Sequence, residues 1–229
     1  MKRRLCMVLL FVVALAANAS AAPPEYVLLI GGPSLKQWEK YKKQPHDHWW
    51  ANFVRAGRIR TEQLRQQHGP DYDITWLVYK RGYVERAAQE GQDLISHINS
   101  VAQKFNTRMI YFDKGSEVIN YLNSGQDRRR VKLSGFEFFG HSNKACFMFD
   151  YSNGLDSASK SWLHEGELHK ITRGIFAKDA IIKSWGCHTG ESMSRKWYKA
   201  TGTHMWGVIG KTQYQMEELP YISTEKVSG

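Results

Sequence analysis

Two segments of this 229-residue chain share one pattern: GFEFFGHSN at residues 135–143 and AIIKSWGCHTG at residues 180–190. In each segment a mostly apolar run ends at a glycine, and a reactive side chain follows, His141 in the first and Cys187 in the second. Apolar runs of this length predict strands that are buried in a parallel sheet. Open α/β sheets bind their ligands at the carboxyl ends of such strands, so the pattern predicts a site at one edge of the sheet.

The rest of the chain alternates β-rich runs with amphipathic segments. Besides the two strands above, strands are predicted near residues 26–30, 74–79, 109–112, 145–151 and 205–209. Helices are predicted over residues 49–67, 83–104, 116–122, 165–176 and 191–200. Alternation with crossovers long enough to be helical predicts an α/β domain with a mostly parallel central sheet and helices on both faces. The polar residues 217–229 are predicted to form a flexible tail.

The first 21 residues have the composition of a secretory signal peptide. Basic residues 2–4 precede an apolar run at 5–15, and a small-residue pattern places a cleavage site near Ala21. The apolar run is too short for the ~20 residues that a transmembrane helix needs, and no later segment approaches that length. We therefore expect residues 22–229 to form a single exported domain, secreted or periplasmic, with no membrane span after the leader is removed.

Charge gives only a weak indication of partners. Removing the three basic residues at positions 2–4 lowers the formal net charge from +10 to +7. The remaining basic residues are scattered, so we do not predict nucleic-acid binding. The run Arg128-Arg129-Arg130 could hold a phosphate, although such a run is more often a solvated face.

Two cysteines remain after Cys6 leaves with the leader, and they allow two interpretations. Cys146 and Cys187 could form a disulfide, because an even pair of cysteines in an exported protein is often paired. Alternatively, Cys187 could be a reactive thiol. Gly186 permits a tight turn before it, and the N-terminal field of a helix predicted to begin near residue 191 would favour its thiolate. The sequence leaves both alternatives open.

Cysteine-dependent acyl transfer needs a thiolate nucleophile, a proton donor for the leaving group, and backbone N–H groups that bind the oxyanion. Cys187 is the candidate nucleophile and His141 the candidate proton donor. The backbone N–H groups of Ser142 and Cys187 are the oxyanion candidates, provided that the two strand ends are neighbours. Gly140 and Gly186 would let the backbone approach closely in support of this site. This chemistry requires no cofactor, and we predict none.

These residues carry a resemblance. An apolar strand that ends at His-Ser or His-Gly, followed by a second that ends at Ala-Cys, Ser-Cys or Gly-Cys, resembles the caspase and legumain clan of cysteine peptidases. Cys187 follows His141 by 46 residues, which is similar to the clan's spacing. The Gly-Cys form is similar to separase and to the self-cleaving cysteine peptidase domains of large bacterial toxins. Ser142 stands where the clan usually has glycine, and residues 108–124 look like an additional strand and helix.

The resemblance extends over residues 26–214 and implies a caspase-hemoglobinase-like three-layer sandwich. It also implies that His141 and Cys187 are the catalytic dyad of a hydrolase that cleaves a peptide or amide bond in a peptide or protein substrate. A catalytically inactive, peptidase-like binding domain is the alternative from a different class, because a fold does not determine activity.

A serine hydrolase is a further alternative. The segment FGHSNK at residues 139–144 resembles the Gly-x-Ser-x-Gly elbow of α/β-hydrolases, which would make Ser142 the nucleophile. Lys144 takes the place of the second glycine, and a strand is predicted to follow where the elbow requires a helix. We therefore prefer Cys187 to Ser142.

Two groups of histidines could indicate a metal. His164 and His169 are five residues apart rather than four, so on a helix they would point about 140° away from each other, unlike the pair in zinc peptidases. The segment His46-Asp47-His48 could join His188 in a metal site, but it lacks a clear third ligand. We predict no metal.

Overall fold

A computed structural model describes residues 22–34, 49–150, 161–214, 217–222 and 225–227. The predicted leader, with its cleavage site at Ala21, and the segment His46-Asp47-His48 lie outside the described residues. None of the helices in the described part of the chain is long and apolar enough to span a membrane.

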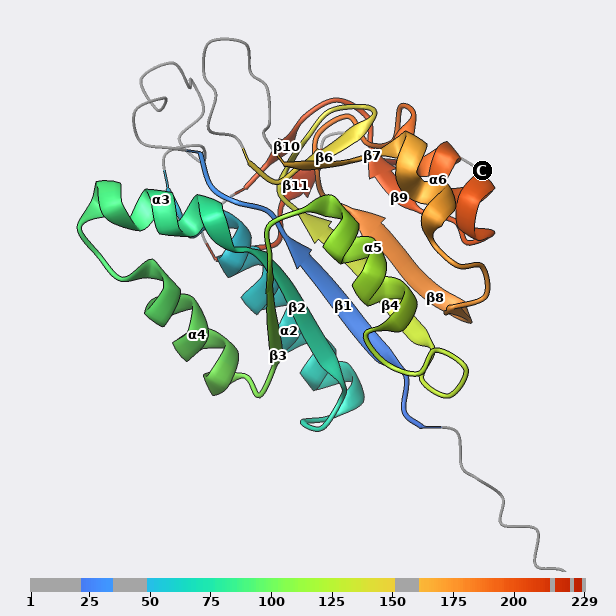
Figure 1. Cartoon of the computed structure of the whole chain (residues 1–229), viewed down its shortest axis with the longest axis horizontal. Coiled ribbons are helices and arrows are strands. Elements are labelled where there is room, and N and C mark those ends of the chain that lie inside the picture. The colour runs from blue at the N-terminus through green and yellow to red at the C-terminus, as the bar shows by residue number, and fades with distance from the viewer. Residues whose placement is uncertain (1–21, 35–48, 151–160, 215–216, 223–224, 228–229) are drawn as a thin grey trace, which may run out of the picture.

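A seven-stranded sheet forms the centre of the structure (Figure 1). Its order is β12-β9-β8-β4-β1-β2-β3. The strands β1, β2, β3, β4, β8 and β9 are parallel, and β12 pairs with β9 in the antiparallel sense. The strands are β1 (Glu25–Ile30), β2 (Ile74–Tyr79), β3 (Arg108–Phe112), β4 (Leu133–Phe139), β8 (Phe176–Ser184), β9 (Trp206–Val208) and β12 (Glu225–Val227). The prediction of a mostly parallel central sheet is confirmed.

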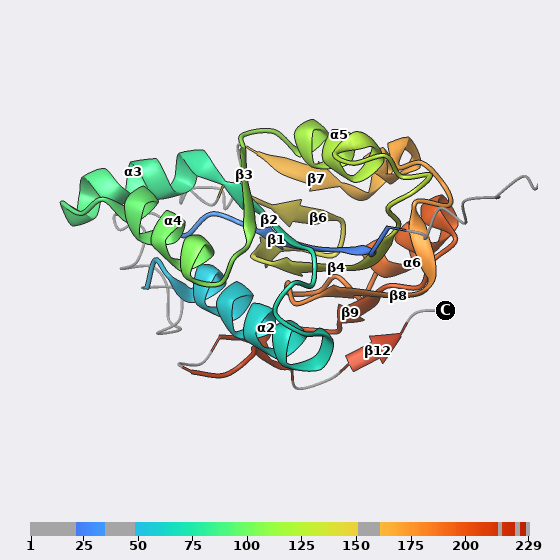
Figure 2. The same cartoon turned by 90° about the horizontal axis from the view of Figure 1, so that it is seen from below.

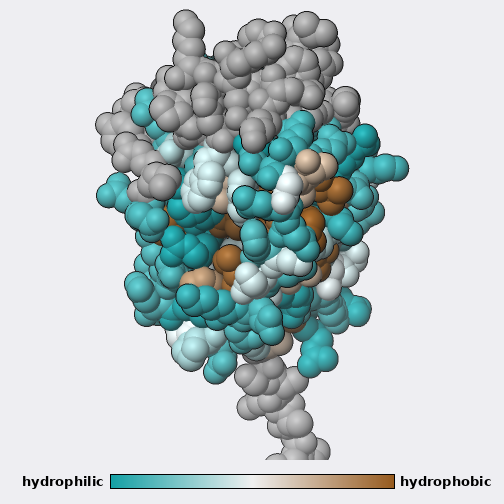
Figure 3. Space-filling view, turned by 90° about the vertical axis from the view of Figure 1, so that its left-hand side faces the viewer, coloured by the Kyte–Doolittle hydropathy of each residue, from teal (hydrophilic) through white to brown (hydrophobic). Residues whose placement is uncertain are grey.

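Helices cover both faces of this sheet, as Figure 2 shows from below. One face carries α2 (Asn52–His68), α3 (Lys80–Glu90) and α4 (Leu94–Lys104); the other carries α5 (Gly115–Ser124), the 3-10 helix η2 (Glu165–Lys170) and α6 (Met193–Thr201). The result is a three-layer α/β sandwich, as the alternation in the sequence predicts. The molecular surface on the side of α3 and α4 is mainly hydrophilic, and apolar side chains are visible in hollows between the polar ones (Figure 3).

Two smaller antiparallel sheets lie at the edge of the central sheet to which the arrowheads of β1, β4 and β8 point (Figure 1). One is formed by β5 (His141–Ser142), β6 (Cys146–Met148) and β7 (Trp162–His164); the other by β10 (Thr212–Gln213) and β11 (Tyr221–Ile222). The candidate histidine is therefore in the first strand of an antiparallel hairpin that follows β4 directly.

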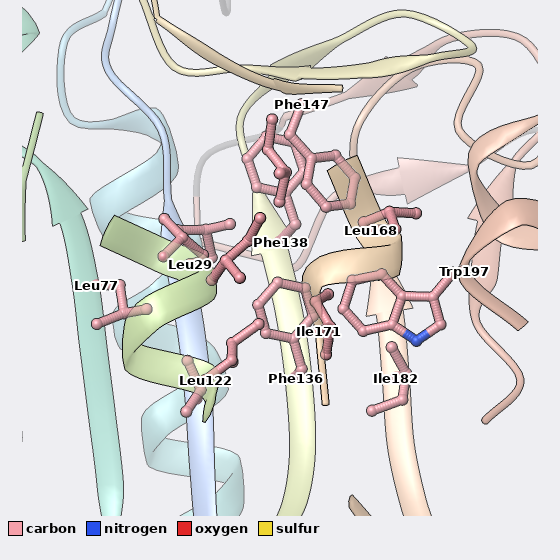
Figure 4. Packing of buried hydrophobic residues seen from close by; sticks show 14 of the residues in the cluster. Leu29, Leu77, Leu122, Phe136, Phe138, Phe147, Leu168, Ile171, Ile182 and Trp197 are labelled. Atoms are coloured by element: carbon pink, nitrogen blue, oxygen red, sulfur yellow. The ribbon is translucent and has the colours of Figure 1, made fainter. Parts of the chain in front are cut away.

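The hydrophobic core is divided by the sheet into two clusters, because alternate side chains of each strand point to opposite faces. Val27 and Leu29 of β1 belong to one cluster, and Tyr26 and Leu28 to the other. All six residues of β1 are buried, which explains why this central strand is an almost continuous apolar run. In Figure 4 the aromatic rings of Phe136, Phe138, Phe147 and Trp197 fill the space between β4 and the helices of one face.

Several predicted elements differ from those in the structure. The helix predicted over 83–104 is two helices, because Gly91 is left-handed with φ of 67° and the Asp93 side chain then caps α4. The helix predicted over 165–176 is only the short η2, and Phe176 already begins β8. The predicted tail at 217–229 contains β11 and β12, so β9 is not the last strand of the sheet.

The basic run at 128–130 is not simply a solvated surface. Arg128 is 6% exposed, and its guanidinium pairs with the fully buried carboxylate of Glu25 at 2.5 Å. Arg129, in contrast, is exposed and pairs with Asp127 at 3.2 Å. The first arginine of the run therefore anchors the start of β1, which makes it a structural residue in this fold.

Candidate active site

The strand order reverses between β1 and β4. After β1 the chain adds β2 and β3 on one side, and it then returns to place β4 on the other side of β1. The crevice outside the carboxyl ends of two such strands is the usual ligand site of an open α/β sheet. The residues that leave β1 here include Gly31 and Ser34, and those that leave β4 are Gly140 and His141.

The segment after β4 that carries His141 (residues 140–142) and the segment after β8 that carries Cys187 (residues 185–188) are the His141 turn and the Cys187 turn. They are neighbours because β4 and β8 pair in parallel. The pairing continues past the last ladder residues, where the Trp185 N–H donates to the Phe138 carbonyl at 2.9 Å. Beyond this point the Ser142 hydroxyl donates to the Cys187 carbonyl oxygen at 2.7 Å. The structure thus meets the condition that the oxyanion prediction required: the two strand ends are adjacent and hydrogen-bonded to each other.

The two predicted supporting glycines lie where the turns approach most closely. A Cβ on Gly186 would overlap the Ser142 hydroxyl and would lie 2.8 Å from the Ser142 Cβ. A Cβ on Gly140 would lie 2.5 Å from the Phe138 ring and 3.3 Å from the Cα of Gly31. Side chains at either position would therefore force the turns apart.

The His141 ring is partly buried and held on two sides. Its edge faces the Phe53 ring, with centroids 4.9 Å apart and planes at 88°. Its Nε2 lies 3.1 Å from the Ser34 hydroxyl oxygen, and Arg86 of α3 in turn donates to the Ser34 carbonyl at 3.0 Å. Sequence reasoning missed Ser34, although its position just after Gly31-Gly32-Pro33 at the end of a central strand was a usable signal.

The Ser142 N–H has a direction that suits an oxyanion donor. The Asn143 N–H bonds the Cys146 carbonyl, so in the β5–β6 ladder Ser142 and its partner Phe147 form the non-hydrogen-bonded pair. The Ser142 N–H therefore points away from β6, toward the open edge of β5. Because Ser142 is in a hairpin strand and its hydroxyl is bound to a carbonyl, it lacks the strand-to-helix elbow of a serine hydrolase.

Cys187 is a partly buried thiol in a tightly constrained turn. The Thr212 N–H donates to its Sγ at 3.4 Å. The next residue, His188, has a left-handed φ of 64°, and such strain in a non-glycine residue is frequent at functional sites. Its N–H bonds the Gly210 carbonyl at 2.7 Å, and its Nδ1 contacts Glu191 at 2.6 Å. Helix α6 begins at Met193, slightly later than predicted.

Tyr214 connects the two turns from a segment distant in sequence. Its hydroxyl accepts the Gly140 N–H at 3.2 Å and donates to the Trp185 carbonyl at 3.4 Å. Burial first, and then the nearby Cys187, raise the pKa of Tyr214 well above its ordinary value, so the hydroxyl keeps its proton. Its ring packs edge-on against Phe53 at 4.9 Å. Nothing in the local sequence distinguishes this tyrosine from the others.

A buried carboxylate, that of Glu137, fixes the Cys187 turn through a hydrogen bond to Trp185. Glu137 of β4 is 1% exposed and accepts the Trp185 indole N–H at 2.7 Å. It also pairs with Arg60 of α2 at 2.6 Å and accepts the Tyr26 hydroxyl. These partners compensate for the buried charge and fix Trp185, two residues before Cys187.

Cys146 differs from Cys187 in its surroundings. Both residues are thiols in this structure, so the two form no disulfide with each other. Cys146 lies on β6 opposite His164. Burial, followed by the charges of Glu165 and Glu167, raises the pKa of the Cys146 thiol to about 11. This environment disfavours a thiolate, which makes Cys146 a poor nucleophile.

The histidines that could indicate a metal have local partners. The His164 side chain accepts the Gly166 N–H and caps η2, and His169 Nδ1 lies 2.7 Å from the Gly166 carbonyl oxygen. His188 pairs with Glu191. Within the described ranges, no group of three or more His, Cys, Asp or Glu side chains is arranged to hold a metal ion.

The fold and the site together describe an α/β protein with a cysteine and a histidine at the carboxyl ends of two adjacent parallel strands. No protein-family model, curated protein or solved structure gives a significant match to this chain. What the site does must therefore be inferred from the chemistry of its own residues.

Proposed function

We propose that this protein is an exported cysteine hydrolase of the caspase and legumain type, which cleaves a peptide or amide bond with Cys187 and His141. The observation that carries the proposal is the parallel pairing of β4 and β8 together with the hydrogen bond between Ser142 and the Cys187 carbonyl. This pairing supports a dyad because it joins the segment after β4, which carries an imidazole, to the segment after β8, which carries a thiol.

In the proposed reaction, the Cys187 thiol passes its proton to His141, and the thiolate attacks the carbonyl carbon of the scissile bond. The Ser142 and Cys187 N–H groups bind the oxyanion that forms. His141 protonates the leaving amine as the C–N bond breaks, which leaves a thioester on Cys187. Water then hydrolyses the thioester, releases the acid product and restores the thiol. No metal or cofactor takes part.

The surrounding residues have positioning roles in this proposal. Ser34 and Phe53 hold the His141 ring, and Tyr214 keeps the two turns in register through its neutral hydroxyl. Catalysis by such groups depends strongly on position, since a displacement of about 1 Å can cost roughly 100-fold in rate.

The proposed location is outside the cytoplasm, because the composition of residues 1–21 is that of a secretory leader. Expression of the full chain with its leader, followed by N-terminal sequencing of the exported product, tests this. We expect a mature N-terminus near Ala22. An intact Met1 on a protein retained in the cytoplasm contradicts export.

Hydrolysis of fluorescently labelled, denatured casein and of a mixed peptide library tests the activity. We expect the mature protein to cleave, and Cys187→Ala and His141→Ala each to lose at least ~1,000-fold in rate while the circular dichroism spectrum is unchanged. Cys146→Ala is the matched control and retains activity, because its thiol is not part of the dyad. Cleavage that persists in Cys187→Ala contradicts the proposed nucleophile. Absence of cleavage by the mature protein across the library supports the inactive binding domain instead.

A further inference from the structure

The segment of residues 209–214, which links β9 to β10 and continues to Tyr214, wraps the Cys187 turn. Its groups bond this turn and the residues on either side of it. The contacts are Gly210 O with the His188 N–H at 2.7 Å, Gly210 N–H with Glu191 at 3.2 Å, Thr212 N–H with Cys187 Sγ at 3.4 Å, and the Tyr214 hydroxyl with Trp185 O at 3.4 Å. Sequence reasoning assigned no role to this segment.

Thr212 is the unusual member of this segment. The residue is 2% exposed, and its Oγ1 is buried with no hydrogen-bond partner in the described part of the chain. A buried hydroxyl without a partner destabilises a fold, and such groups in native structures require an explanation. Valine has nearly the same shape, suits a strand equally well, and would avoid the penalty.

The backbone contact of Thr212 suggests the missing partner of its hydroxyl. The N–H of the same residue already reaches Cys187 Sγ, so the sulfur lies beside the Thr212 side chain. A neutral thiol is a weak hydrogen-bond acceptor, whereas a thiolate carries full charge and makes stronger, charge-assisted bonds. Rotation about χ1 moves a threonine hydroxyl among three staggered positions about the Cα–Cβ bond, two of which are gauche to the backbone nitrogen. One acceptor can therefore engage both donors of Thr212 once the sulfur becomes charged.

We propose that Thr212 is a positioning residue whose hydroxyl turns to the Cys187 sulfur when the thiolate forms and holds it together with the Thr212 N–H. The inference rests on the proposed function, since it assigns a role to a residue beside the proposed nucleophile. When the thiol proton passes to His141, the sulfur gains the negative charge and the Thr212 O–H bond is retained, so the step transfers one proton and forms one hydrogen bond.

Other titratable groups also face this sulfur or its turn. They are His141 of β5, next to the Ser142 that bonds the Cys187 carbonyl, the His188–Glu191 pair after Cys187, Lys144, whose charge acts on Glu191, and Tyr214 from the wrapping segment. All of them are unchanged in variants at position 212. A comparison of two such variants, one with and one without a hydroxyl, therefore isolates the effect of that group.

The test uses Thr212→Val, which removes the hydroxyl at nearly constant shape, and Thr212→Ser, which keeps it, in the mature chain carrying Cys146→Ala. The rate of Cys187 alkylation by iodoacetamide is measured against pH by mass spectrometry. In Thr212→Val we expect the midpoint of the alkylation rate against pH to rise by about one pH unit, so that alkylation is roughly tenfold slower below that midpoint. Thr212→Ser should match the parent. The thermal midpoint of Thr212→Val should equal or exceed that of the parent, because an unpaired buried group is gone.

Thr212→Ala is the second variant without a hydroxyl, and it should show the same pH shift even if the valine does not fit. An unchanged alkylation profile in both hydroxyl-free variants overturns the proposal and leaves Thr212 Oγ1 as an unpaired group only. An equal shift in Thr212→Ser also overturns it, because the backbone and not the hydroxyl would then be responsible. These outcomes are independent of hydrolysis, so they are distinct from a failure of the proposed function, which the Cys187→Ala comparison decides.

Discussion

Gly186→Ala should separate the two turns of the candidate site, and the structure gives the expected size of the effect. The new Cβ would overlap the Ser142 hydroxyl and would lie 3.0 Å from the Phe138 ring. Overpacking of this kind costs about 1–3 kcal/mol. Moving Ser142 away to relieve the contact also breaks its 2.7 Å hydrogen bond to the Cys187 carbonyl, worth about 1 kcal/mol. We therefore expect the free energy of unfolding to fall by about 2–4 kcal/mol.

Ser142→Gly provides the second arm of a double-mutant cycle. Alone it loses the hydrogen bond and adds backbone freedom, for a loss of about 1.5–2 kcal/mol. In the double variant, the Ser142 atoms that the new Cβ at position 186 would strike are absent. Its loss should therefore be smaller than the sum of the two single losses by about 1–2 kcal/mol, which is within the range for residues in contact.

Urea denaturation followed by far-UV circular dichroism measures all four proteins of this cycle. The result that refutes the reasoning is additivity within about 0.5 kcal/mol, which is typical of sites that do not touch. The positions of His141 and Cys187 would then not depend on each other through these turns.

Of three further predictions, two concern the surroundings of the site and one concerns the start of β1, at the opposite edge of the sheet. Tyr214→Phe removes the hydroxyl that accepts the buried Gly140 N–H. It should lower the free energy of unfolding by about 1–3 kcal/mol and reduce the rate of casein hydrolysis. Unchanged values in both assays contradict the role of Tyr214 as a bridge between the two turns. Cys146, whose thiol pKa is raised to about 11, should react with iodoacetamide at pH 8 far more slowly in the folded protein than in urea. Equal rates in the two states would contradict the raised pKa of this thiol in the fold. Burial is the largest single influence on the Glu25 carboxyl and raises its pKa, but hydrogen bonds from Thr75 and Tyr121 and the charge of Arg128 together outweigh it, so the Glu25 pKa is lowered. A lowered folded pKa contributes stability above the unfolded value, and that stability is lost as pH falls through the folded value. Stability of the native protein should thus decrease below about pH 4.5, and Arg128→Ala should cost about 3–5 kcal/mol at pH 7; a flat acid limb would contradict this.

The central part of the fold could be predicted because its strands are buried on both faces. β1, β2 and β4 lie in the interior of the sheet and are buried almost throughout, so their sequences are mostly apolar and stand out from the rest. The features that sequence reasoning missed depend on single backbone conformations or on pairing. Gly91 ends α3 through a left-handed conformation, and β12 joins the sheet edge by backbone hydrogen bonds that polar side chains do not reveal.

The candidate site likewise has residues that could be predicted from the sequence and residues that could not. His141, Cys187 and the two glycines before them follow predictable strands, so their places at the ends of β4 and β8 could be predicted. That the two ends are adjacent could not, because strand order is set by the crossovers and not by the strands themselves. Ser34 and Tyr214 reach the site from distant segments, and only tertiary packing brings them there.

The central claim is that His141 and Cys187 act together, and the pH dependence of Cys187 alkylation in the mature protein and in His141→Ala tests it most directly. The dyad predicts that iodoacetamide modifies Cys187 well below pH 8 in the native fold, because the neighbouring imidazole accepts the thiol proton. In His141→Ala the midpoint should rise toward about 8.5, the value of an ordinary thiol. Identical profiles in the two proteins, or modification of Cys187 only after denaturation, would contradict the dyad.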